Sequence, residues 1–141
     1  MQLGAFFGYL SFGFISDRFG RKPTFTAYLL AAAVIVPIYG QLARTPAALM
    51  ILGPVLGFVG HGYFSLFGAM LAELFPTSAR ASGQGFSYNM GRALSSLAPF
   101  TVGTLSETYG IGSALGLTSA FFVMGAFLIR LLPETRGVDL R

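Results

Sequence analysis

The chain has 141 residues, of which 54% are hydrophobic and only 10% are charged. An ordinary globular chain carries roughly 25% charged residues, so too little polar surface is present here to cover a soluble particle. The absence of cysteine excludes disulfides, thiolate metal sites and a cysteine nucleophile. The net charge of +4 does not indicate a nucleic-acid partner, because the basic residues cluster at helix ends and not along one face.

Charged residues divide the chain into long apolar segments. Runs without Asp, Glu, Lys or Arg cover residues 23–43, 45–72 and 108–129, and the run 81–106 is interrupted only by Arg92. A helix that crosses a bilayer needs about 20 mostly apolar residues, and each of these runs is long enough. The sequence therefore predicts an all-α fold, a polytopic transmembrane helical bundle.

In chain order, a short charge-free segment comes first and four helices of spanning length follow. The first segment is too short to cross a bilayer comfortably, so we interpret it as the end of a longer helix. Pro46 suits the first position of its helix, while Pro37, Pro54 and Pro99 are expected to bend theirs. The predicted helices cover residues 1–16 (partial), 23–43, 46–72, 82–106 and 111–132, followed by a tail of residues 133–141.

Small residues recur at four-residue spacing inside the predicted helices. Such pairs let helix backbones approach closely in a bilayer, where packing drives association. General helix packing and a dedicated dimer motif are the two interpretations of this pattern. The pairs are Gly4 and Gly8, Gly53 and Gly57, and Gly112 and Gly116.

The distribution of basic residues predicts the orientation of the bundle. Strict alternation of spans places the turn after the first segment, the connection 73–80 and the C-terminal tail on one side. Seven basic residues lie on that side and only Arg44 lies on the other, which predicts that the basic side and the C-terminus are cytoplasmic. The seven are Arg18, Arg21, Lys22, Arg80, Arg130, Arg136 and Arg141.

Three polar motifs lie between the helices or after them, and they carry a family resemblance. They read Gly13-x-x-x-Asp17-Arg18-x-Gly20-Arg21-Lys22, then Glu73-Leu74-Phe75-Pro76-Thr77 with Arg80 and Gly83-Gln84-Gly85-Phe86-Ser87-Tyr88-Asn89-x-Gly91-Arg92, and finally Leu132-Pro133-Glu134-Thr135-Arg136-Gly137. On these motifs the chain resembles the major facilitator superfamily of secondary transporters. The similarity is closest to proton-linked porters of sialic acid, aromatic acids, other small organic acids and sugars.

This resemblance implies a fold and a place within it. Residues 1–141 would form the C-terminal portion of a major-facilitator transporter, from the end of the eighth helix to the twelfth, as a partial half with four full spanning helices plus a clipped one. The first motif also occurs in the first half of such proteins, so an assignment to helices two to six stays open. Because these proteins build the substrate site between two six-helix halves, the missing N-terminal half is an implied partner.

The charged residues at the predicted cytoplasmic helix ends form one candidate site. Carboxylates and guanidiniums can pair bidentately there and hold helix ends together. The resemblance implies that such a network is a latch. Its ion pairs form when the cytoplasmic side of the transporter is closed, and they break when that side opens. The alternative is a set of solvated end charges, each pair worth about 0–1 kcal/mol. The candidates are Asp17, Arg18, Arg21, Glu73, Arg80, Glu134 and Arg136.

Arg92 is the centre of a second candidate site. It lies about ten residues into its predicted helix, hence roughly 15 Å deep, where an arginine usually faces a cavity or a partner. Its spacing from Gln84, Tyr88 and Ser95 predicts one polar stripe along the helix, which suits a water-filled pathway for an anionic substrate. A structural pairing with a carboxylate of the missing half and snorkelling to the interface are the alternatives.

His61 is a further candidate because histidine can change its charge near neutral pH and so take part in proton coupling. The alternative, which we favour, is a hydrogen-bonded packing residue between Gly60 and Gly62. The complete set of transport-pathway candidates is His61, Gln84, Tyr88, Asn89, Arg92 and Ser95.

The sequence contains no catalytic constellation, metal-ligand cluster or phosphate-binding loop, so we predict neither an enzyme nor a cofactor. We expect a secondary transporter of a small organic solute, by resemblance a proton-coupled organic acid, that works by alternating access. The predicted surroundings are the lipid bilayer of a bacterial inner membrane, an anionic small molecule and protons. The alternative is an inactive truncated fragment or a half-transporter that only assembles with another half.

Overall fold

The protein is a bundle of helices. The computed structural model describes residues 1–42 and 45–135, and within them it contains helices and turns and no strand, which confirms the predicted all-α class. The elements are α1 (Gln2–Phe19), α2 (Arg21–Leu42), α3 (Pro46–Gly62), the 3₁₀ turn η1 (Tyr63–Leu66), α4 (Phe67–Leu74), α5 (Arg80–Ser95), α6 (Ala98–Tyr109) and α7 (Ile111–Leu131).

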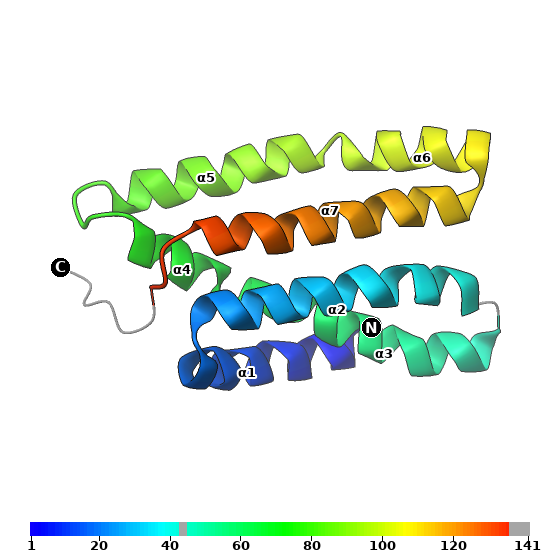
Figure 1. Cartoon of the computed structure of the whole chain (residues 1–141), viewed down its shortest axis with the longest axis horizontal. Helices are drawn as coiled ribbons and strands as arrows, with labels where there is room; N and C mark the ends of the chain where they lie inside the picture. Colours follow the sequence, from blue (N-terminus) through cyan, green and yellow to red (C-terminus); the bar gives the residue numbers. More distant parts are fainter. Residues whose placement is uncertain (43–44, 136–141) are drawn as a thin grey trace.

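The helices run side by side along one axis (Figure 1). α1 packs against α3, and α2 packs against both α3 and α7. α5 and α6 follow one another along one side of the bundle, where α6 contacts α7 and α5 contacts α4. No residue of α5 or α6 is buried. The face of the bundle that these two helices form is therefore open, without other described helices to cover it.

Three helical segments are long and apolar enough to cross a membrane in the part of the chain that the structure describes. They are α2, α7 and a continuous segment formed by α3, η1 and α4. This last segment stays helical through η1, since the backbone angles of Gly62, Tyr63 and Phe67 are all right-handed helical. The predictions for 23–43, 46–72 and 111–132 are therefore confirmed to within two residues at each end.

The prediction of one uninterrupted helix over 82–106 is wrong. The structure divides this stretch into α5 and α6, with Ser96 and Leu97 between them. Pro99 has no N–H group and cannot bond to the carbonyl four residues earlier. The Leu97 N–H bonds instead to the Leu94 carbonyl, three residues back, at 3.2 Å, which is the tighter 3₁₀ pattern. Neither α5 with 16 residues nor α6 with 12 is long enough to span alone.

The first two helices are longer than predicted and are separated by a single residue. α1 continues three residues beyond the predicted end, and α2 begins at Arg21 instead of Pro23. Charged residues favour water but do not stop helical hydrogen bonding, so both helices extend past their apolar segments. Gly20 makes the turn with φ +104°, a left-handed conformation that glycine adopts without strain.

Glycines bring the backbones of α1 and α3 into contact. A Cβ atom on Gly4 would lie 1.7 Å from the Pro54 carbonyl oxygen, and one on Gly57 would lie 2.1 Å from the Met1 carbonyl oxygen. The close approach predicted for the glycine pairs of these two helices is confirmed. At both glycines of the third pair, in α7, no described atom lies within 4 Å of an added Cβ, so that pair makes no such contact.

Gly4→Ala is expected to lower the free energy of unfolding by about 1–3 kcal/mol, because the added methyl group forces α1 and α3 apart. Gly112→Ala is the matched control. Its methyl group enters open space, and the variant should gain about 0.5–1 kcal/mol from helix propensity. Unfolding of both variants in detergent measures the difference, and equal stabilities would contradict the close helix contact.

A cluster of buried side chains lies just inside the charged ends of the helices. Phe12, Phe25, Tyr28 and Met70 are its members. The Phe12 ring meets the rings of Phe25 and Tyr28 edge-on, with both centroid distances at 4.8 Å, a favourable arrangement for aromatic pairs. The cluster holds α1, α2 and α4 together and so positions the charged residues that follow.

Candidate functional site

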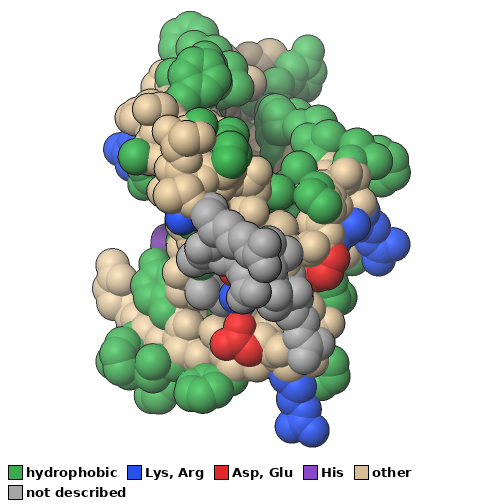
Figure 2. Space-filling view, turned by 90° about the vertical axis from the view of Figure 1, so that its left-hand side faces the viewer, with side chains coloured by type: hydrophobic (Ala, Val, Ile, Leu, Met, Phe, Trp, Pro, Cys, Tyr) green, Lys and Arg blue, Asp and Glu red, His purple; other side chains and the backbone are tan. Residues whose placement is uncertain are grey.

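The charged end of the bundle is organised around Arg21. Figure 2 shows this end, where several acidic and basic side chains reach the surface. Arg21 donates from Nη1 to Oδ1 of Asp17 at 2.8 Å and to Oγ of Ser16 at 2.9 Å, and from Nη2 to Oε1 of Glu73 at 3.1 Å. The Arg21 and Glu73 side chains are only 13% and 12% exposed, whereas Asp17 is 69% exposed. The attraction to Glu73 is therefore less screened by water than the attraction to Asp17.

The segment after α7 returns to the same place. The Glu134 carboxylate accepts hydrogen bonds from the backbone N–H groups of Arg21 at 2.9 Å and Lys22 at 3.2 Å. It thereby caps the N-terminus of α2, where the helix dipole favours a negative charge. The buried Thr135 donates from Oγ1 to Oε2 of Glu73. We call this network the charged cluster; its members are Ser16, Asp17, Arg21, Glu73, Glu134 and Thr135.

The charged cluster contains four of the seven residues that the sequence nominated for a charge network. Of the others, Arg18 is exposed, with its guanidinium carbon 6.0 Å from the Phe19 ring centroid. Arg80 donates from Nε to the Ala72 carbonyl at 3.0 Å and so binds the end of α4. Arg136 lies outside the described residues.

Sequence reasoning missed Ser16 and Thr135. Each directly adjoins a nominated carboxylate in the sequence, and this adjacency is the signal that could have found them. Serine and threonine are common at helix ends for reasons of capping alone, so the adjacency by itself does not distinguish a network member from an ordinary polar residue.

Glu134→Ala is expected to lower the free energy of unfolding by about 1 kcal/mol, because it removes the cap of α2. Glu134→Gln keeps an acceptor oxygen and loses only the charge, so its cost should be smaller, about 0.3–1 kcal/mol. Glu107→Ala removes an exposed carboxylate of α6 that accepts no hydrogen bond from the described residues and serves as control. Equal effects of Glu134→Ala and Glu107→Ala in thermal unfolding would contradict the capping role.

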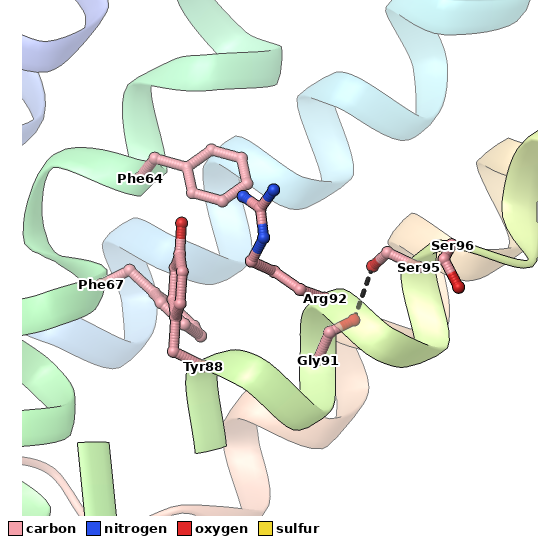
Figure 3. Close-up of a pocket in the computed structure, with 7 residues that line it drawn as sticks. All are labelled: Phe64, Phe67, Tyr88, Gly91, Arg92, Ser95 and Ser96. Carbon is pink, nitrogen blue, oxygen red and sulfur yellow. Dashed lines mark hydrogen bonds between the residues drawn. The ribbon is translucent and has the colours of Figure 1, made fainter. Parts of the chain in front are cut away.

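An open pocket of about 450 Å³ lies between α5 and the segment formed by η1 and α4. The Tyr63 and Phe64 rings stack with centroids 4.6 Å apart, and the Phe64 ring meets Phe67 edge-on at 6.4 Å. The aromatic wall of the pocket is therefore held by ring contacts within η1 and α4. The pocket is lined by Phe64, Phe67, Tyr88, Gly91, Arg92, Ser95 and Ser96 (Figure 3).

Arg92 is the one charged side chain among the lining residues of this pocket. Its guanidinium carbon lies 5.8 Å from the centroid of the Tyr88 ring, and the side chain extends from α5 toward the turn that carries Phe64 (Figure 3). No described carboxylate oxygen lies within 4.0 Å of its guanidinium. A cation–π contact of this kind contributes about 0.5–2 kcal/mol, so the guanidinium is oriented while its charge stays unneutralised by the described residues.

Half of the nominated pathway residues line this pocket, namely Tyr88, Arg92 and Ser95. Gln84 instead donates from Nε2 to a carbonyl of α4 at 2.8 Å and so connects α5 to α4. Asn89 is exposed and donates to a carbonyl of its own helix at 2.7 Å.

His61 lies elsewhere, exposed on α3, and its ring makes no hydrogen bond with another described residue. The favoured interpretation of His61 as a hydrogen-bonded packing residue is therefore wrong for the described part of the chain. The pocket residues that sequence reasoning missed are Phe64, Phe67, Gly91 and Ser96. The first two are three residues apart and therefore share one helix face, but such pairs are frequent in a chain with 15 phenylalanines. The spacing alone therefore does not distinguish a pocket wall from ordinary packing.

The described helices and their motifs match a known family. A family model described as Major Facilitator Superfamily matches residues 1–140. The chain belongs to the major facilitator superfamily. The resemblance inferred from the three motifs is thereby confirmed, as is the prediction of an integral membrane protein that is not an enzyme.

Similar proteins come from several bacteria. A "Probable 4-methylmuconolactone transporter" of Cupriavidus pinatubonensis is 37% identical, over 98% of this chain and 32% of the relative. A cis,cis-muconate transport protein of Acinetobacter baylyi is 30% identical, over 86% of this chain and 28% of the relative. A sialic acid transporter of Escherichia coli is 28% identical, over 92% of this chain and 32% of the relative. The chain thus spans about a third of the length of these relatives.

Proposed function

We propose that this chain forms part of a secondary transporter that moves a small organic acid together with protons by alternating access. The observation that carries the proposal is Arg92, which lines a pocket between helices without a described carboxylate partner. A cation inside a membrane protein is costly unless it serves a pathway or a partner. A substrate carboxylate would supply the missing anion, because a guanidinium can hold both of its oxygens at once.

The names of the relatives support an acid as the substrate. Two are named for muconate or a muconolactone and one for sialic acid, and all of these compounds carry a carboxylate. The order of the three motifs supports placing the chain at the C-terminal end of the transporter, from the end of helix eight to helix twelve. In that assignment α5 and α6 together form the eleventh helix.

We assign the charged cluster to a cytoplasmic gate in its closed state. The ends of α1, α2 and α4 and the segment after α7 meet there. Opening this end of the bundle would separate Arg21 and Thr135 from Glu73. The excess of basic residues at this end supports its cytoplasmic placement in a bacterial inner membrane.

Proton coupling needs a group that can gain and lose a proton during the cycle. The described carboxylates all lie at or beyond helix ends, away from the middle of the bundle. Histidine is the side chain whose charge changes nearest to neutral pH, so His61 on α3 is our candidate. The carboxyl group of the substrate itself is the second possible carrier.

Uptake into proteoliposomes tests the proposal. With an acidic outer solution, the reconstituted protein should accumulate cis,cis-muconate above the level of protein-free liposomes. A protonophore should abolish this accumulation, because it dissipates the driving gradient. Accumulation that survives the protonophore would contradict proton coupling. Absence of uptake for every carboxylate tested, both by the chain alone and together with a separately produced first half, would contradict transport of an organic acid.

A half-transporter that assembles with another half is the second candidate function. It is favoured by the open face of the bundle, since α5 and α6 bury no residue and the pocket beside Arg92 lies along α5. Uptake by the chain reconstituted alone would exclude this candidate. Uptake that appears only after a separately produced first half is added would support it.

A further inference from the structure

The pocket beside Arg92 has aromatic walls. Phe64 and Phe67 face it from η1 and α4, and Tyr88 faces it from α5 (Figure 3). Phe64 is stacked on Tyr63 with an interplanar angle of 26°, so its ring is held by a neighbour. Aromatic rings interact most favourably with another flat π system, in offset-stacked or edge-to-face arrangements.

The serine hydroxyl groups of the pocket are already used as donors. Ser95 donates from Oγ to the Gly91 carbonyl at 2.8 Å, and Ser96 donates to the Ala93 carbonyl at 2.7 Å. A hydroxyl has one proton to donate, which leaves Tyr88 as the one lining hydroxyl whose proton is not committed to a described acceptor. A polyhydroxylated acid would therefore find few hydrogen-bond donors here to replace the water molecules that donate to its hydroxyl oxygens, which is unfavourable.

We infer that this site prefers flat, unsaturated carboxylates with few or no hydroxyl groups over saturated or polyhydroxylated acids. Arg92 binds the carboxylate, and the conjugated part of the acid lies against the rings of Phe64, Phe67 and Tyr88. The inference rests on the proposed function, because it concerns the acid that Arg92 would bind. It adds the chemical class of that acid.

Three six-carbon dicarboxylates of equal charge separate the effect of a flat conjugated chain from the effect of hydroxyl groups. trans,trans-Muconate is flat and conjugated, adipate is saturated and flexible, and galactarate carries four hydroxyl groups. Uptake of each is measured in proteoliposomes, with protein-free liposomes as background. We expect a KM for muconate about two- to tenfold below that for adipate, the range that aromatic contacts provide, and the highest KM for galactarate.

Variants of the wall test the same point. Phe64→Leu should lower the adipate-to-muconate KM ratio while adipate uptake continues, because leucine keeps an apolar wall but removes one of the three flat rings. Phe67→Leu is a second variant with the same expectation, in case the first reduces the amount of folded protein. Phe100→Leu is the matched control, since Phe100 is an exposed residue of α6 that does not line this pocket, and it should leave the ratio unchanged.

The outcomes separate this inference from the proposed function. Equal KM values for the three acids, or a preference for galactarate, would overturn the inference and leave transport of an organic acid intact. An adipate-to-muconate KM ratio that neither Phe64→Leu nor Phe67→Leu lowers would also overturn it. Failure to take up any of the three acids would instead overturn the proposed function.

Discussion

Replacement of Arg21 by methionine is expected to lower the free energy of unfolding by about 3–5 kcal/mol, the cost of leaving a nearly buried charge without its partner. The Glu73 carboxylate is only 12% exposed and faces Nη2 of Arg21 at 3.1 Å. After the substitution, the Thr135 hydroxyl still donates to Glu73, but a neutral donor does not balance the negative charge. The end of α4 would then lose its electrostatic attachment to α2.

Asp17→Asn is the matched control for this prediction. Asp17 contacts the same guanidinium at 2.8 Å but is 69% exposed, so its loss should cost no more than about 1 kcal/mol. The double variant Arg21→Met with Glu73→Met should recover most of the loss, because two packed apolar side chains can replace a buried ion pair. Thermal unfolding in detergent compares all of these variants, and equal stability of Arg21→Met and Asp17→Asn would refute the role of burial.

Arg92→Gln is expected to reduce the uptake of organic anions about 10- to 100-fold. Hydrogen bonds to a charged group contribute about 1.5–3 kcal/mol, and this range corresponds to such factors in affinity. Arg92→Lys should fall between the wild type and Arg92→Gln, because lysine keeps the charge but cannot hold both carboxylate oxygens with a planar fork. Initial uptake rates over a range of substrate concentrations measure the loss in kcat/KM.

Arg18→Gln provides the control for the charge change. Arg18 is exposed at the end of α1, where its guanidinium carbon lies 6.0 Å from the Phe19 ring centroid, and it forms no hydrogen bond or ion pair with a described residue of the charged cluster. The Arg18→Gln substitution removes one positive charge and leaves the pocket residues unchanged, so uptake should stay unchanged. If Arg92→Gln folds normally and still takes up anions as fast as Arg18→Gln, Arg92 does not bind the substrate.

The helix positions could be predicted because they depend on local properties of the sequence. A run of about 20 apolar residues matches the thickness of a bilayer core, and charged residues mark where such a run ends. This reasoning placed α2, α7 and the segment from α3 to α4 to within two residues. It was less accurate at the end of α1, because helical hydrogen bonding continues beyond the apolar residues.

The break between α5 and α6 could not be derived from the sequence alone. Pro99 predicts a bend, but neighbouring helices can hold a proline-containing helix together. In this structure α5 packs on α4 while α6 packs on α7, so the two parts have different supports. The Leu97 N–H group donates to the Leu94 carbonyl, three residues earlier. α5 ends and α6 begins at this point.

The sequence by itself determined that this protein is a membrane bundle with most of its basic residues at one end, because apolar length and charge position are properties of each segment alone. It also identified Arg21 and Glu73 as candidates for a charge network and Arg92 as a candidate for the transport pathway. The tertiary structure decided which residues these side chains contact. Arg21 and Glu73 are 52 positions apart, and Glu134 is 113 positions from the N–H group it caps. Such contacts depend on how helices pack across the bundle, and periodicity within one helix carries no information about that packing.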